Sequence, residues 1–131
     1  MRDFIITTDT TCDLPESYIL ENKLDLHPLF YHFNDSVIYG KDENLDPVVF
    51  YQRMRDGEMP TTMASNPEDS KDLFEARIKE GYDIIHIAFS SGLSSTCQNA
   101  VIAANELSED YPDAKITVID SLCASMGEGL L

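Results

Sequence analysis

Three short apolar runs constrain the fold more than any other feature of this sequence. They lie at residues 4–7 (Phe-Ile-Ile-Thr), 82–89 and 116–119, and each ends in polar residues. Such runs are typical of strands buried on both faces. Stretches with helical features separate them. Because strands that alternate with helices form βαβ units, we expect an α/β fold with a mainly parallel sheet and helices on both faces.

Start and stop signals place the helices between these strands. Asp13 and Glu16 are spaced like a capping box, which predicts a short helix running to about Glu21. Asn66-Pro67-Glu68-Asp69 is typical of a helix N-terminus, and Gly81 ends that helix. The remaining expected segments are a strand with an irregular centre (24–33), an extended piece (36–39), a helix (46–57), a polar loop (60–65), a helix (92–107) and a last helix beginning near Ser121.

The length of 131 residues suits one domain, and no internal repeat or linker divides it. Residues 127–131 (Gly-Glu-Gly-Leu-Leu) turn apolar with no capping or breaking residue after them. That pattern favours a chain cut inside a helix over a natural C-terminus.

Charge and cysteine content exclude several classes of function. The net charge is −15, from 24 acidic and 9 basic residues, and such a field repels nucleic-acid phosphates and anionic membrane surfaces. No apolar run reaches the ~20 residues that cross a bilayer, and no signal peptide is recognisable, so a cytoplasmic location is expected. The three cysteines have no CxxC spacing, and the three histidines lack metal-ligand spacing. We therefore expect neither a disulfide framework nor a metal site.

Hydroxyl side chains follow the carboxyl end of each expected buried strand. Thr10 follows the first strand, Ser91, Ser94 and Ser95 follow the second, and Ser121 follows the third. The carboxyl ends of parallel strands share one sheet edge, and helix N-termini there offer unpaired N–H groups. This predicts a site for a carboxylate or small anion. The alternative is that these residues only cap helices.

The nucleophile-elbow pattern GxSxG and the phosphate loop GxxxxGK[ST] are both absent, so the hydroxyls do not indicate a serine hydrolase or a P-loop enzyme.

Four motifs, in order along the chain, resemble those of the DegV family. Residues 8–15 (TDTTCDLP) resemble the family's TDSTxDLP opening, and Pro60-Thr61-Thr62 resembles its PxTSQ loop. Residues 90–100 (SSGLSSTCQNA) resemble SSxLSGTYQxA, and residues 118–129 resemble the VIDS…SxGxG segment. The chain departs from the family at Met63-Ala64, at Ser95 in place of glycine, and at Cys97 in place of an aromatic residue.

The resemblance implies a carrier that binds one long-chain fatty acid and catalyses no reaction itself. It implies that residues 1–131 are the N-terminal α/β domain of a longer protein, whose second, lid domain lies outside this chain. Thr62 and Ser94 match hydroxyls that bind the carboxylate, with the N–H of Ser95 beside them, while Ser91, Thr10 and Ser121 line the same edge.

The implied partners are the fatty acid and a separate fatty-acid kinase that makes an acyl phosphate for phospholipid synthesis, with no cofactor. Two alternatives stay open: an enzyme or binder of a small phosphorylated metabolite, and a purely structural domain. The absence of Lys and Arg from the site segments favours a monocarboxylate over a phosphate.

Overall fold

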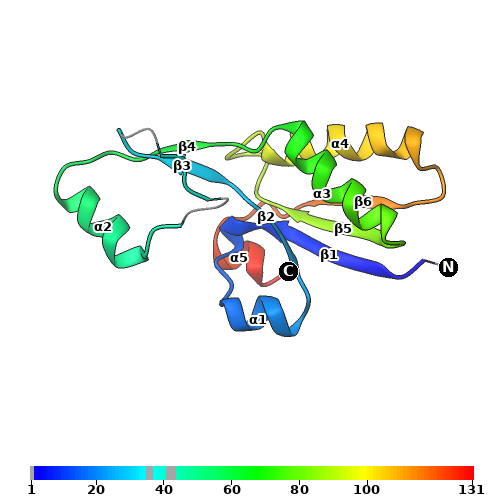
Figure 1. The fold of residues 1–131 in the computed structure, drawn as a ribbon, viewed down its shortest axis with the longest axis horizontal. Coiled ribbons are helices and arrows are strands. Elements are labelled where there is room, and N and C mark those ends of the chain that lie inside the picture. Colours follow the sequence, from blue (N-terminus) through cyan, green and yellow to red (C-terminus); the bar gives the residue numbers. More distant parts are fainter. Residues whose placement is uncertain (1, 35–36, 41–43) are drawn as a thin grey trace. The chain divides into compact units, whose positions relative to one another are not determined.

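The computed structural model describes residues 2–34, 37–40 and 44–131, and the chain forms two compact units. Unit 1 comprises Met1–His27 and Ser65–Leu131, and unit 2 comprises Pro28–Ala64. Figure 1 labels their elements.

Unit 1 is built on a four-stranded sheet in which every pairing is parallel, in the order β2-β1-β5-β6 (Figure 1). Ile84 lies at the centre of the register, paired with Ile5 on one side and Ile116 on the other. The parallel sheet confirms the predicted α/β fold. The elements are β1 (Phe4–Asp9), the 3-10 helix η1 (Thr10–Cys12), α1 (Glu16–Glu21), β2 (Asp25–His27), α3 (Pro67–Lys79), β5 (Asp83–Ala88), α4 (Thr96–Asp110), β6 (Ile116–Asp120) and α5 (Met126–Gly129).

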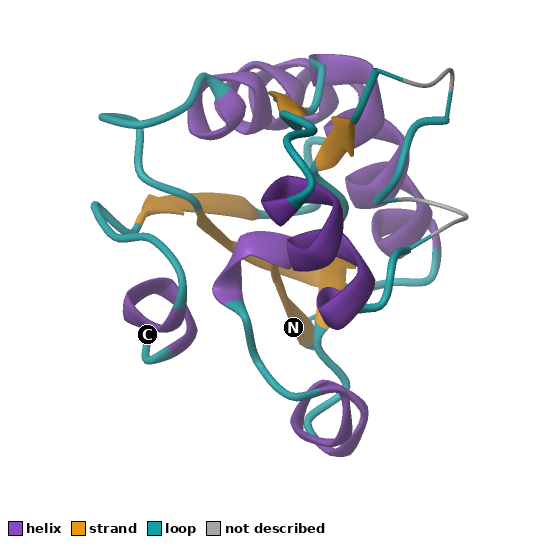
Figure 2. Cartoon of the chain, turned by 90° about the vertical axis from the view of Figure 1, so that its left-hand side faces the viewer, coloured by secondary structure: helices purple, strands orange, loops and turns teal. Residues whose placement is uncertain are grey.

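The core of unit 1 lies between the sheet and the helices α3 and α4. Phe74 of α3, Ile84 of β5 and Leu107 of α4 are almost fully buried there. Alternate residues of β5 are buried, as expected for a strand whose successive side chains point to opposite faces. The short helix α5 lies on the other face, where Glu128 accepts a hydrogen bond from the Thr8 hydroxyl. Helices therefore flank the sheet on both faces (Figure 2).

The helix α3 begins as its sequence predicts. The Asn66 side chain accepts from the Asp69 N–H at 2.8 Å, and the Asp69 carboxylate accepts from the Asn66 N–H at 3.3 Å, which together form a capping box. The predicted start of α4 at residue 92 is wrong, since the helix begins at Thr96. A turn precedes it, in which the N–H groups of Leu93 and Ser94 both donate to the Ser90 carbonyl.

The described residues of unit 2 form an antiparallel strand pair and one helix, with bounds β3 (Phe30–His32), α2 (Pro47–Arg55) and β4 (Thr61–Met63). The predicted polar loop at 60–65 is wrong over β4, because Thr62 pairs with Tyr31 of β3. The single strand expected at 24–33 is also divided: β2 joins the parallel sheet and β3 the antiparallel pair. Part of the extended piece expected at 36–39 lies outside the described residues, and Tyr39 forms an isolated bridge to Tyr31.

Aromatic side chains form the interior of unit 2. Phe33 is fully buried and packs against Phe50 with ring centroids 5.4 Å apart. Tyr31 stacks on Tyr39, and the Arg53 guanidinium lies 4.0 Å from the centre of the Phe33 ring. These contacts within one short segment give unit 2 a small core of its own.

Candidate functional site

The carboxyl ends of the strands in unit 1 meet at one edge of the sheet, as predicted. Ala88 at the end of β5 pairs with Asp120 at the end of β6. The two loops that follow are tied together, because the Ser90 N–H donates to the Cys123 carbonyl and the Ser121 N–H donates to the Ala88 carbonyl. The segments 90–96 and 121–123 therefore line the same edge.

Ser94 is half-buried just before α4, and its hydroxyl caps the N–H of the first helical residue, whereas the side chain of Ser95 at the N-cap position makes no such bond. Its Oγ accepts from the Thr96 backbone N–H at 3.2 Å and lies 2.9 Å from Thr96 Oγ1. Thr96 is fully buried, whereas Ser95 between them is exposed. A hydroxyl oxygen can accept twice and donate once. When Thr96 donates through both groups, the Ser94 proton is left to reach a ligand.

The other predicted hydroxyl residues at this edge differ in whether they already make hydrogen bonds within the protein. Ser91 is exposed, and its N–H donates to an oxygen of Asp120. A hydrogen bond from the Ser91 side chain, followed by the backbone N–H groups of Leu122 and Ser91, lowers the pKa of Asp120. Ser121 is buried, and its hydroxyl donates to the Cys123 carbonyl while accepting from the Cys123 N–H. Thr10 is half-buried in η1.

Thr62 lies in unit 2, where its backbone pairs with Tyr31 and its side chain is exposed on β4. Ser65, where unit 1 resumes, is held beside α4 because its carbonyl accepts from the Asn99 side chain at 2.7 Å.

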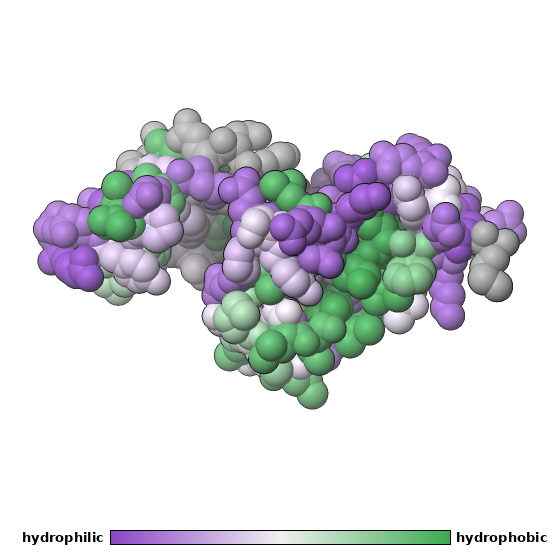
Figure 3. Space-filling view, turned by 90° about the horizontal axis from the view of Figure 1, so that it is seen from below, coloured by the Kyte–Doolittle hydropathy of each residue, from purple (hydrophilic) through white to green (hydrophobic). Residues whose placement is uncertain are grey.

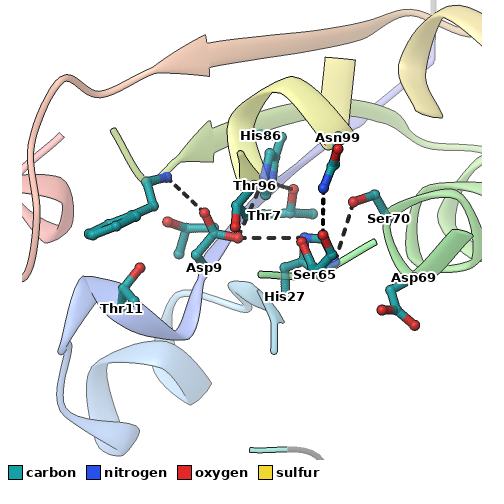
Figure 4. Close-up of polar contacts among 12 residues, drawn as sticks. Thr7, Asp9, Thr11, His27, Ser65, Asp69, Ser70, His86, Thr96 and Asn99 are labelled. Atoms are coloured by element: carbon teal, nitrogen blue, oxygen red, sulfur yellow. Dashed lines mark hydrogen bonds and ion pairs between the residues drawn. The ribbon is translucent and has the colours of Figure 1, made fainter. Parts of the chain in front are cut away.

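Sequence reasoning missed a cluster of three buried ionisable residues at the same edge (Figure 4). Asp9 ends β1, His27 ends β2 and His86 lies in β5, and all three are fully buried. Asp9 Oδ1 lies 3.5 Å from His27 Nδ1 and 3.8 Å from His86 Nε2. His86 was expected to be a sheet-packed histidine, and its ring does pack against Phe74, but no local spacing links it to Asp9.

Burial shifts the pKa values of this cluster toward the uncharged forms. It raises the pKa of Asp9 to about 7, although the hydrogen bond from the Phe89 N–H opposes that rise. Burial, reinforced by the neighbouring His27, lowers the pKa of His86 to about 3. The pKa of His27 is lowered by burial as well.

A second buried carboxylate lies on the other face of β1. Glu128 of α5 is almost fully buried, and its two oxygens accept from the hydroxyls of Thr8 and Thr11, each at 3.0 Å. Burial nevertheless raises its pKa. These bonds tie the TDTT segment to α5, so two of the motifs that resemble the family's are in contact.

The family model described as "Uncharacterised protein, DegV family" matches residues 3–131. The chain belongs to the DegV family. A DegV domain-containing protein of Clostridium perfringens is 39% identical over 132 residues, which cover 100% of this chain and 45% of the relative. The chain thus spans less than half the length of that DegV relative.

Solved structures of DegV proteins share the fold. A stearic acid-binding protein from Eubacterium ventriosum matches with a TM-score of 0.88 and 28% identity, covering 97% of this chain and 44% of that one. A fatty-acid-binding DegV protein from Thermus thermophilus matches with a TM-score of 0.84 and 30% identity, covering 99% and 44%. Among the described residues, no helix has the length and apolar character needed to cross a bilayer.

Proposed function

We propose that this chain is the carboxylate-binding domain of a carrier for one long-chain fatty acid. The main support for the proposal is the position of Ser94, which is half-buried immediately before α4. The fold that presents it is shared with fatty-acid-binding proteins. In this role the Ser94 hydroxyl and the N–H of Ser95 donate to the carboxylate. Such charge-assisted hydrogen bonds are stronger than those between neutral groups.

Apolar side chains beside these hydroxyls support a ligand with a hydrocarbon tail. Leu93 is 66% exposed immediately before Ser94, and Leu122 is 74% exposed immediately after Ser121. Figure 3 shows apolar side chains gathered on the face of unit 1 that points downward in Figure 1. Exposed apolar side chains that gather on one face are typical of a binding face.

The charge of the site favours a monocarboxylate over a phosphate. The segments that carry the proposed ligand-binding residues Thr10, Thr62, Ser91, Ser94, Ser95 and Ser121 contain no Lys or Arg, and the whole chain carries −15. A dianionic phosphate without a cationic side chain would be repelled more strongly than a single carboxylate.

In the complete carrier, we propose that Thr62 adds a second hydroxyl to the carboxylate and that a further domain covers the acyl chain. The length of the relatives supports a second domain, since this chain covers only 45% of the C. perfringens protein. The carrier itself supplies no catalytic group, and it presents the carboxylate to a separate fatty-acid kinase in the cytoplasm.

Organic extraction and mass spectrometry of the purified full-length protein, beside the 131-residue chain, test this proposal. One equivalent of a long-chain fatty acid in the full-length sample is the expected result. An empty protein that also fails to bind added fatty acid would contradict the proposal, and binding of a phosphorylated metabolite instead would establish the alternative.

A further inference from the structure

The buried cluster of Asp9, His27 and His86 presents three unpartnered polar atoms to one another (Figure 4). Asp9 Oδ1, His27 Nδ1 and His86 Nε2 are buried and have no hydrogen-bond partner among the described residues. All three atoms lie within 4.8 Å of one another. Buried polar groups are nearly always satisfied, so three that converge on one point indicate a common partner.

The remaining polar atoms of the same side chains are already held. Asp9 Oδ2 accepts from the Phe89 N–H at 2.7 Å. His86 Nδ1 lies 2.8 Å from the Thr7 hydroxyl, and His27 Nε2 lies 3.4 Å from the Ser70 hydroxyl. A second hydrogen bond to the far ring nitrogen is the usual outer contact of a metal-binding histidine, because it fixes the ring and its tautomer.

Asp9 is buried without a cationic side chain beside it among the residues that the structure describes. Within the described part of the chain, the ion-pair contacts of Asp9 are those with the two histidines, and neither a lysine nor an arginine is among them. Glu128, the second buried carboxylate, lies on the other face of β1 and is held by the Thr8 and Thr11 hydroxyls. A bound cation could take the place of the proton that a buried carboxyl group otherwise holds.

We propose that Asp9, His27 and His86 bind one divalent cation of the zinc type, at a site that joins the ends of β1 and β2 to the middle of β5. Two imidazole nitrogens and one carboxylate oxygen suit Zn²⁺ and neighbouring first-row metals, whereas Mg²⁺ and Ca²⁺ prefer oxygen ligands. Tetrahedral ligands about 2.1 Å from zinc lie roughly 3.4 Å apart. The observed separations of 3.5 and 3.8 Å to Asp9 need only small side-chain adjustments.

A water molecule would complete the tetrahedral coordination of the cation. Ser65 Oγ is also buried without a hydrogen-bond partner among the described residues, and its sticks overlap those of His27 in the view of Figure 4. A hydroxyl at this place can hydrogen-bond to a metal-bound water. The sequence spacing did not indicate this site because its ligands come from three separate strands. The proposal does not depend on the fatty-acid function.

The test is zinc binding to the purified protein after treatment with a chelator. Native mass spectrometry should show one zinc per chain, and isothermal titration should give the dissociation constant. Cobalt binding to the wild-type protein adds a direct readout, since its visible spectrum distinguishes nitrogen and oxygen ligands from thiolates. This matters because Cys12 and Cys97 are free thiols.

His27→Gln and His86→Gln should each weaken zinc binding by more than 100-fold, because loss of an outer partner alone costs about 10- to 100-fold. Ser70→Ala, which removes such an outer partner, should fall in that range. His32→Gln is the matched control, because His32 contacts the Phe33 carbonyl in unit 2, and it should leave zinc affinity unchanged.

Three results would overturn the proposal: a wild-type protein that binds no zinc, as expected if a water bridges the three groups; zinc affinity that both cluster variants leave unchanged; or a thiolate cobalt spectrum. Because the cobalt spectrum is measured on the wild type, the test holds even where a histidine variant fails to fold.

Discussion

Replacing Ser94 by alanine and, separately, by aspartate distinguishes its capping role from its proposed ligand role. The cap needs only an acceptor for the Thr96 N–H, which lies 3.2 Å from Ser94 Oγ. The ligand role needs a donor to the fatty-acid carboxylate. Alanine removes both functions, whereas aspartate keeps the acceptor, lacks the donor and repels a carboxylate.

The two variants should therefore separate stability from affinity. Loss of a capping hydroxyl costs about 1 kcal/mol, so Ser94→Ala should lower the thermal midpoint of unfolding by about 4 °C. Ser94→Asp should keep the wild-type midpoint, since a negative charge also suits a helix N-terminus. A hydrogen bond to a charged group contributes about 1.5–3 kcal/mol, so Ser94→Ala should weaken fatty-acid binding roughly 10- to 100-fold and Ser94→Asp at least as much.

The assay pairs thermal unfolding of the ligand-free protein with titration of a fluorescent fatty acid. Ser108→Ala serves as the matched control, because its hydroxyl donates to the Ala104 carbonyl within the same helix α4. It should leave affinity at the wild-type value. Wild-type affinity in Ser94→Asp would refute the ligand role and leave Ser94 as a cap alone.

Four further predictions follow from the geometry. Thr62→Val should weaken fatty-acid binding in the same titration without changing the thermal midpoint, because Thr62 is exposed on β4. Phe74→Ala should lower the free energy of unfolding by about 3–5 kcal/mol in urea denaturation, because Phe74 is fully buried in the core. Gly40→Ala should destabilise unit 2 in hydrogen exchange, since Gly40 has φ +118° and an added Cβ would overlap the Leu29 carbonyl oxygen. Burial raises the pKa of Glu128 above its ordinary value of 4.5, so the wild type should lose stability as the pH rises from 4.5 through the folded-state pKa. Glu128→Gln should abolish that part of the slope in denaturation series across pH.

Sequence reasoning located the elements that local patterns determine. The strands β1, β5 and β6 lie at the three apolar runs, and the Asn66-Pro67 start of α3 carries its own cap. The strand β4 was missed because Thr61–Met63 is exposed and polar, so only its pairing with β3 makes it a strand. The split between β2 and β3 depends likewise on which distant strand each one meets.

The candidate site also has a part that local patterns predict and a part that they do not. The common edge of Ser91, Ser94 and Ser121 could be predicted because these residues follow strands whose carboxyl ends lie together. The contact of His27 with Asp9 depends on the order of the strands, since β2 pairs beside β1 and not elsewhere. A local sequence pattern identifies a strand but does not show which strand lies beside it in the sheet.

The geometry of Ser94 shows that capping a helix and binding an anion are compatible roles for one serine. A serine before a helix was taken either as a cap or as a ligand for an anion. The Ser94 oxygen accepts from the Thr96 N–H and can accept from the Thr96 hydroxyl, and neither bond uses its own proton. When the Thr96 hydroxyl is the donor, the Ser94 proton is left to reach a ligand. In that arrangement the proposed ligand role does not compete with the bonds that hold the start of α4.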